Sequence, residues 1–511
     1  MSGQKWLGGL TIHTALLCRE LERLGHQIAV VSIGADAVVD QFPHQRVRHG
    51  GPPERGAAYL RETNGRSVRD GEFVFRYEVV ADATRYLPPG PPVVRTALAP
   101  VARLGITIVT PPAQHSRAPL TQARGAAASF ARAVTAALDA GLSGGAAEAP
   151  FLSRLLLHTD RQDLDRLEQI REWFRPDAEY VCDLALVPMM ARLRDRGIPL
   201  VAAAQGFELV HRRGVGLVEA LHRYRHRLDL ILSGSQANID ENVYQLPAFA
   251  DGDVPARVIP YGVALDGGWE LARSAAIRWV RSLEADLTVE QRGPYGLWGS
   301  AGPPIDGAEN GKPFIITSLS RLDVEKGADL ALHALSILRR WGVPARLWIA
   351  GQAMPGSAYL DVLRQKIRLM DLAHCVSLIG TLRDTIDKVA LLRASDAFVA
   401  GFIRSEPFGL VYTEAFATEL PVVAPDTGAA PELMAYVGDT STLYPANDTG
   451  ALAERLKMLY TSPERRAAIA AKERRAFLER YNATEMAKAL AAEIEEAIRC
   501  RAGRPHGGPT K

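Results

Sequence analysis

Cysteine, net charge and long apolar runs are all scarce in this 511-residue sequence. Its four cysteines are far apart and form no Cys-x-x-Cys pair, which argues against a disulfide framework or a zinc site, so we expect buried or neutral thiols. No run of about 18 apolar residues occurs, so no transmembrane helix is expected. The chain does not open with a charged and then apolar signal pattern, so the cytoplasm is the expected compartment.

The charges of the chain almost cancel. Lys and Arg number 60 against 58 Asp and Glu, which leaves +2 and no overall field to attract nucleic acid. The hydrophobic share of 47% and the charged share of 23% are those of a globular protein. At roughly 150 residues per domain, the length corresponds to about three domains, and two large α/β domains fit as well.

Short apolar runs alternate with helical patterns between residues 314 and 460. Strands joined by helices of this length can pair in parallel, so the pattern predicts a doubly wound sheet. The predicted strands are 314–320, 346–350, 376–379, 397–400, 421–424 and 442–444, and the helices between them are 328–338, 358–370, 386–394 and 411–418.

The first half of the chain shows a weaker pattern of the same kind. A helix closed by Gly25 precedes a β-branched run, and further apolar runs follow. Two doubly wound sheets predict a cleft between them, with ligands outside the carboxyl ends of the strands. The predicted strands here are 27–33, 73–80, 106–110, 180–182, 200–204, 228–232 and 257–260.

These patterns give a domain plan. Residues 1–265 form an N-terminal Rossmann-like domain with an insertion near 113–150, and 266–312 form a connection rich in Gly, Pro and Asn towards its end. Residues 313–480 form the second Rossmann-like domain, and 481–511 a C-terminal helix and tail, opened by Asn482 and Glu485 at capping-box spacing.

Two cations follow the predicted strand 314–320. Residues 320–327 read Ser-Arg-Leu-Asp-Val-Glu-Lys-Gly and lead into a helix, so Arg321 and Lys326 stand beside a helix N-terminus at the end of a strand. Such a place suits a diphosphate. Taken alone, the loop favours solvated charges over a diphosphate site.

Two carboxylates with seven residues between them stand in the segment 405–415. In a continuous helix, Glu406 and Glu414 would lie about 12 Å apart along the axis, too far to act on one atom. Pro407 and Gly409 indicate instead that the helix starts after Glu406. The free N–H groups near Gly409 could then receive an anion between the two carboxylates.

The C-terminal half resembles the nucleotide-sugar domain of glycosyltransferase family 4. The resemblance covers most of the chain, is tighter in this half, and implies the GT-B fold: two doubly wound parallel-sheet α/β domains, Rossmann-like, facing a central cleft. The segments that carry it are 321–327, 406–414, 421–424 (Pro-Val-Val-Ala) and 428–432 (Gly-Ala-Ala-Pro-Glu), with weaker support from Gly8-Gly9, 175–177 and 258–263.

The resemblance implies catalytic roles for three residues. Arg321 and Lys326 would bind the diphosphate of a nucleotide-sugar donor and stabilise the departing nucleoside diphosphate. Glu406 would contact the transferred sugar. Because the two cations neutralise the leaving group, neither a metal nor a cofactor is expected. Retention would follow from a same-face substitution rather than from a glycosyl-enzyme intermediate, so Glu406 is not expected to be a nucleophile.

The resemblance also implies donor-binding roles. Backbone groups at Phe408, Gly409 and Leu410 would hold sugar hydroxyls and phosphates, and Glu414 would accept hydrogen bonds from the ribose. Gly9 would allow the backbone of the N-terminal domain to approach the phosphates.

The chain departs from the family pattern in its first half. Gln205 stands where family members commonly have His, and either orients the donor sugar or acceptor or is a plain loop residue. Glu208 is an acidic candidate for the same cleft or an ordinary surface charge. Tyr261 replaces the usual Asn. No apolar strand precedes Gly8-Gly9, so we expect the true start to lie upstream.

The acceptor is not predicted by these motifs. The basic cluster at 222–227 is either a solvated helix face or a contact for a phosphorylated acceptor or a membrane surface. The leading hypothesis is a retaining glycosyltransferase that uses a nucleoside-diphosphate sugar and an acceptor that is a small molecule, a glycan or lipid-linked. The alternatives are a non-catalytic GT-B scaffold that binds nucleotide sugar or a partner enzyme, and a related phosphorolysis or epimerisation.

Overall fold

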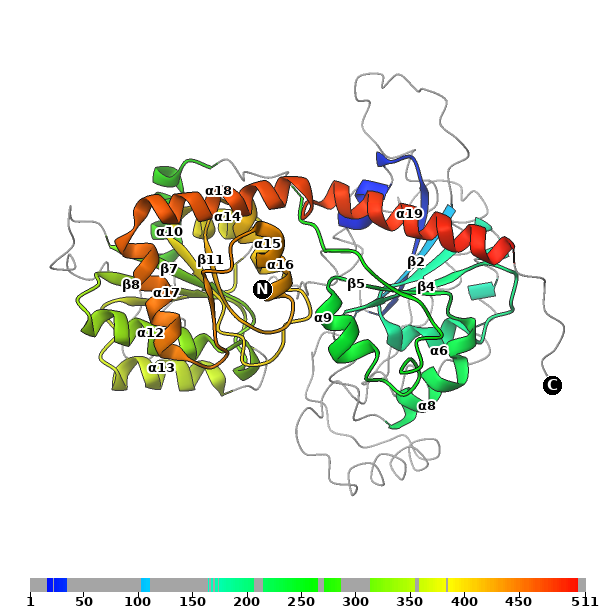
Figure 1. The fold of residues 1–511 in the computed structure, drawn as a ribbon, viewed down its shortest axis with the longest axis horizontal. Helices are drawn as coiled ribbons and strands as arrows, with labels where there is room; N and C mark the ends of the chain where they lie inside the picture. Colours follow the sequence, from blue (N-terminus) through cyan, green and yellow to red (C-terminus); the bar gives the residue numbers. More distant parts are fainter. Residues whose placement is uncertain are drawn as a thin grey trace, which may run out of the picture. The chain divides into compact units, whose positions relative to one another are not determined.

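The computed structural model divides the chain into two compact units (Figure 1). The first comprises Met1–Ile259 with Ala487–Lys511, and the second Pro260–Met486. The described residues are 16–34, 103–110, 164–205, 215–264, 271–285, 313–353, 358–382 and 385–503, apart from 22, 165, 166, 169, 170 and 173.

The first unit is built on a parallel sheet whose described strands follow one another in chain order, β1-β2-β3-β4-β5-β6. The predicted strands at 27–33, 106–110, 180–182, 200–204, 228–232 and 257–260 are confirmed, each with small shifts at its ends. The strands are β1 (Gln27–Gly34), β2 (Arg103–Thr110), β3 (Ala178–Val181), β4 (Leu200–Ala204), β5 (Leu230–Ser233) and β6 (Ala256–Val258). The predicted strand 73–80 and the insertion at 113–150 lie outside the described residues.

Short helices connect these strands. Ser235 caps the first of them after β5, where its side chain accepts a hydrogen bond from the Asn238 backbone, and that helix continues directly into a π-helical turn. The helical segments are η4 (Leu184–Leu186), α6 (Val187–Met190), α8 (Val215–Tyr224), η5 (Arg225–Arg227), α9 (Gln236–Asn238) and η6 (Ile239–Val243).

The second unit holds a six-stranded parallel sheet with the order β12-β11-β10-β7-β8-β9. The chain runs outward from β7 through β8 to β9, returns to place β10 on the other side of β7, and continues to β12. The order therefore reverses between β7 and β10, the position where doubly wound sheets bind ligands. The strands are β7 (Phe314–Leu319), β8 (Ala345–Ala350), β9 (Val376–Gly380), β10 (Ala397–Val399), β11 (Val422–Pro425) and β12 (Leu443–Tyr444).

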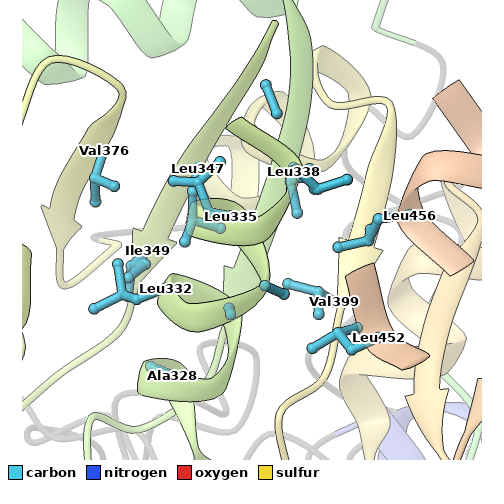
Figure 2. Close-up of a cluster of buried hydrophobic side chains, with 14 of the residues drawn as sticks. Ala328, Leu332, Leu335, Leu338, Leu347, Ile349, Val376, Val399, Leu452 and Leu456 are labelled. Atoms are coloured by element: carbon cyan, nitrogen blue, oxygen red, sulfur yellow. The ribbon is translucent and has the colours of Figure 1, made fainter. Parts of the chain in front are cut away.

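Helices cover both faces of this second sheet, as predicted for a doubly wound fold. On one face, α12 (Ala328–Arg340) packs with α13 (Tyr359–Leu369) and α17 (Thr449–Thr461) around Leu332, Leu335 and Leu456 (Figure 2). The other face packs against α10 (Arg273–Ala285), α14 (Thr385–Ala394), α15 (Leu410–Ala417), α16 (Ala430–Val437) and α18 (Pro463–Glu479).

Two elements differ from a simple linear domain plan. Helix α10 lies within the range 266–312 and buries Ala276 and Val280 against α14 and the second sheet. Helix α19 (Ala483–Ala502) begins in the second unit and continues in the first. Its predicted capping residue is confirmed, because Asn482 Oδ1 accepts the Glu485 N–H at 3.0 Å. In the part of the chain that is described, no helix combines the length and apolar character needed to cross a bilayer.

Candidate functional site

The loops that follow β7 and β10 meet at the switch point of the second sheet. After β7, Asp323 caps a 3₁₀ turn, Val324–Lys326, by accepting the Lys326 N–H, and Gly327 closes the turn with φ 57°. A Cβ on Gly327 would lie only 1.8 Å from the carbonyl oxygen of Gly401, in the loop after β10. Glycine is therefore required for the close approach of these two backbones.

The meeting of the two loops pairs two of the predicted catalytic residues. Lys326 Nζ donates to Glu406 Oε2, although the two residues are 80 positions apart in the sequence. The side chains are only 20% and 19% exposed. The ammonium also lies 4.7 Å from the centre of the Phe402 ring, a cation–π contact. The site thus holds a largely buried ion pair that packs against the Phe402 ring.

Arg321 lies on the same loop but in a more open position. Its side chain is 46% exposed, and Nη1 is 3.5 Å from Asp323 Oδ2. A guanidinium carries five N–H donors and can bind several oxygens of an anion. The loop therefore carries one largely buried cation, Lys326, and one half-exposed cation, Arg321.

The N-terminus of α15 follows immediately after Glu406. Gly409 has φ 77° and caps the helix, and a Cβ there would lie 2.7 Å from the Tyr412 ring. The carbonyl of Glu406 accepts the Ala429 N–H at 3.0 Å, and this bond fixes the backbone just before α15. The first N–H groups of α15 have no partners within the helix and carry its positive dipole end. This end of α15 can hold an anionic group beside Lys326.

The predicted donor-binding residues 408–410 have different environments. The Phe408 side chain is buried, with its ring centre 5.0 Å from that of Tyr261, so only its backbone is available to a ligand. Leu410 is half-buried at the first position of the helix. Tyr412 is fully buried, and burial, with a smaller effect of the Glu406 carboxylate, raises its pKa well above the usual value.

Glu414 lies at the fifth position of α15 and is buried in an ion pair. Lys388 Nζ, on α14, donates to Glu414 Oε1 at 2.5 Å, and the two side chains are 20% and 10% exposed. Glu414 is predicted from its motif, whereas Lys388 is not predicted from the sequence. A lone lysine in a helix resembles a solvent-facing residue, and no local pattern links it to a glutamate 26 positions later.

Residues 305–476 match the family model described as Glycosyl transferases group 1. This region contains all of β7 to β12 and both the Lys326–Glu406 and Lys388–Glu414 ion pairs. The chain is thus similar to this family over the sheet of its second unit.

Curated relatives of the chain are similar mainly over part of their length. The GDP-mannose-dependent alpha-(1-6)-phosphatidylinositol monomannoside mannosyltransferase of Mycolicibacterium smegmatis is 31% identical over 194 residues, which cover 36% of this chain and 45% of the relative. The lipopolysaccharide core biosynthesis mannosyltransferase LpsB of Rhizobium meliloti is 29% identical, with coverage of 39% and 58%. The chain thus spans about half the length of these relatives.

Solved structures give weaker similarity over more of the chain. Anabaena Alr3699/HepE in complex with UDP has a TM-score of 0.46 at 20% identity, covering 65% of this chain and 82% of its own. The E. coli structure described as trehalose-6-phosphate bound with UDP-2-fluoro glucose has a TM-score of 0.49 at 16% identity, covering 67% and 77%.

The candidates outside the group 1 domain belong to the first unit. Gln205 directly follows β4 at the carboxyl end of the sheet and is half-buried. Gly9 and Glu208 lie outside the described residues, so their predicted roles stay predictions.

The basic cluster at 222–227 is partly engaged within the first unit. Arg225 forms an ion pair with Asp251, and Arg227 donates to the carbonyls of Ala191 and Leu193. His222, Arg223 and His226 are exposed. These contacts give two of the arginines a structural role.

Proposed function

We propose that the protein is a glycosyltransferase that transfers a sugar from a nucleoside-diphosphate sugar to an acceptor with retention of anomeric configuration. The observation that carries the proposal is the Lys326–Glu406 pair at the switch point of a group 1 domain, beside the N-terminus of α15. A cation, a carboxylate and free N–H groups within one small region match the three parts of a glycosyl phosphate: anionic phosphates, sugar hydroxyls and a leaving group that gains charge.

Lys326 and Arg321 would act on the diphosphate. A lysine ammonium has three donors, so Lys326 can keep Glu406 on one N–H and offer the others to phosphate oxygens. Arg321 would turn from Asp323 towards the same group. Their positive charge would stabilise the departing nucleoside diphosphate most strongly in the transition state, which is why no metal or other cofactor enters this proposal.

Glu406 would orient the donor sugar rather than attack it. Its carboxylate is held by Lys326 and would accept hydrogen bonds from sugar hydroxyls. In the proposed same-face substitution, the leaving phosphate oxygen takes the proton of the acceptor hydroxyl as the new glycosidic bond forms. The backbone at Phe408, Gly409 and Leu410 would hold the sugar and phosphates, and Glu414 would accept from the ribose.

The first unit would supply the acceptor contacts. The residues proposed to contact the acceptor or the donor are Gln205, Glu208 and Gly9. The proposed acceptor is a small molecule, a glycan or a lipid-linked molecule. One relative is named as GDP-mannose-dependent, which makes GDP and GDP-mannose the first ligands to test.

A thermal-shift experiment tests the donor site. UDP, GDP and ADP, and their sugar conjugates, are added to the wild type and to the double variant Lys326→Ala/Glu406→Ala. At a ligand concentration about a hundred times Kd, we expect the wild-type Tm to rise by roughly 5–10 °C. The double variant should show no shift. A shift that survives the double substitution would overturn the site.

Lys472→Ala is the matched control. Lys472 Nζ forms an ion pair with Asp439 Oδ2 at 2.9 Å, at the opposite end of α16 from the candidate site. Its loss removes a comparable ion pair without touching the switch point, so the ligand-induced shift should be retained. If the wild type binds a nucleotide sugar but forms no product with any acceptor pool, the non-catalytic scaffold becomes the better interpretation.

A further inference from the structure

The ion pair between Lys388 and Glu414 lies at the ligand-binding edge of the second sheet. Helices that follow parallel strands begin at the carboxyl edge of the sheet. Lys388 is the fourth residue of α14 and Glu414 the fifth residue of α15. At 1.5 Å per residue, both side chains leave their helices within about 6–8 Å of that edge. The pair therefore lies at the same edge as Lys326 and Glu406.

The geometry of the pair leaves half of the carboxylate available. Lys388 binds Oε1 of Glu414, and among the described residues Oε2 has no hydrogen-bond partner. A carboxylate has about four lone-pair positions, so Glu414 can still accept two hydroxyl hydrogens. The lysine ammonium would limit the rotation of the carboxylate, because the two side chains are only 20% and 10% exposed.

Stability alone does not explain a pair of this kind. A largely buried ion pair is on average no more stabilising than apolar residues of the same volume. Helix α14 is also anchored independently, because Asp387 accepts a hydrogen bond from Trp279 Nε1 on α10 at 2.9 Å. Helix α14 thus has contacts to α10 and the sheet that do not involve Lys388.

We propose that Lys388 is a positioning residue that orients the Glu414 carboxylate to recognise the ribose hydroxyls of the nucleotide donor. The inference rests on the proposed function, since it takes Glu414 as the ribose contact. Lys388 acts through Glu414: without the bond from its ammonium, the carboxylate would rotate and would lose its preference for a ribose diol.

The test compares ribose with deoxyribose. The nucleoside diphosphate among UDP, GDP and ADP that binds the wild type most tightly is titrated against its 2′-deoxy and 3′-deoxy forms by calorimetry. We expect the wild type to prefer the ribonucleotide by roughly ten- to hundredfold, as for other hydrogen bonds to a charged group. Lys388→Met and Glu414→Gln should each reduce that preference to a few-fold, and Lys388→Arg should retain most of it.

A double variant shows whether the lysine acts through the glutamate. Lys388→Met/Glu414→Gln should lose no more ribose preference than Glu414→Gln alone. Lys472→Met, which breaks the ion pair with Asp439, should leave the preference unchanged. If the Lys388–Glu414 ion pair were merely structural, breaking it would lower Tm but leave the ratio of ribose to deoxyribose affinity as in the wild type.

The outcomes separate the two proposals. If none of the three nucleoside diphosphates binds the wild type, the proposed function fails. If one binds and Lys388→Met keeps the full ribose preference, the role of Lys388 is overturned while the donor site stands. Retention of the preference in Glu414→Gln would overturn the inference as well, since Glu414 would then not contact the ribose.

Discussion

Single residues at the switch point are constrained by backbone geometry as much as by charge. Gly409 combines φ 77° with a position where a Cβ would press on the Tyr412 ring at 2.7 Å. Gly438 has a similar φ of 75° at the end of α16, but a Cβ added there would meet open space, with nothing within 4 Å. The two glycines therefore separate the effect of backbone strain from that of crowding.

Gly409→Ala should destabilise the protein more than Gly438→Ala. The left-handed φ alone costs about 1–2 kcal/mol in each variant. Crowding against Tyr412 should add about 1–3 kcal/mol at position 409, and should disturb the start of α15 and weaken nucleotide binding. Chemical denaturation and thermal shift measure the two effects. Equal losses of stability in the two variants would show that the Tyr412 ring can move away from the added methyl group at no cost.

The buried carboxyl group of Glu473 should make the stability of the protein depend on pH. It is fully buried on α18, where Oε1 accepts the Val422 N–H at 3.2 Å, and burial raises its pKa well above the usual value. The native state therefore keeps its proton at pH values where the unfolded chain has lost it. Stability contributed by this group is complete below about pH 4.5 and falls as pH rises towards the native pKa.

Glu473→Gln removes this titration. The difference in unfolding free energy, variant minus wild type, should grow with pH between 5 and 8, by up to about 1.4 kcal/mol per pH unit. Denaturation at several pH values measures it, and Lys472→Gln on the same helix is a control without a buried carboxyl. A constant difference across this range would mean that Glu473 is ionised in the folded protein.

At the scale of elements, Asn482 joins two helices. Its Oδ1 caps α19 through the Glu485 N–H, and its Nδ2 donates to the Leu478 carbonyl near the end of α18 at 2.8 Å. Asn482→Ala removes both bonds and should cost about 1–3 kcal/mol. Asp448→Ala removes a single cap of α17, the bond from the Ala451 N–H, and should cost about 1 kcal/mol. If urea titrations show comparable losses of unfolding free energy in the two variants, Asn482 does not stabilise both helices.

The elements of the second unit could be predicted from the sequence because each has a strong local signal. Strands such as β7 and β8 are apolar runs buried on both faces, and Gly342 marks a turn between α12 and β8. Helix α10 was not predicted within 266–312, although Ala276 and Val280 have helical spacing. Its buried face is narrow, and the Gly- and Pro-rich stretch that follows made the whole range resemble a connection.

The candidate site was predictable as a set of residues but not as pairs. Lys326, Glu406 and Glu414 follow from motifs, because each motif is contiguous. The pairing of Lys326 with Glu406 depends on β10 lying next to β7. No local sequence pattern predicts that strand order. The same holds for Lys388, whose partner lies on the next helix.

At the scale of the molecule, α19 contributes to the core of the first unit. Its residues Leu490 and Ile494 are buried, and Arg501 forms ion pairs with Asp195 and Asp229 of that unit. Leu490→Ala/Ile494→Ala should destabilise the first unit by about 4–8 kcal/mol if the two losses add. Hydrogen exchange should then rise in β3, β4 and β5.

The second unit provides the internal comparison for this variant. Exchange in β7, β8 and β11 should stay as in the wild type, because their core does not include Leu490 or Ile494. Ala substitution of Leu332 and Leu335, on α12, should give the reverse pattern. Equal increases of exchange in both sheets for either variant would show that the units unfold as one.

The division of the chain at Ile259 and Met486 has a consequence for synthesis on the ribosome. Domains commonly fold in order from the N-terminus as they emerge. Here the first unit is incomplete until Ala487–Lys511 has been made, whereas the second unit, Pro260–Met486, is by then already whole. The first unit must therefore wait for Ala487–Lys511, so the second unit can be folded before it.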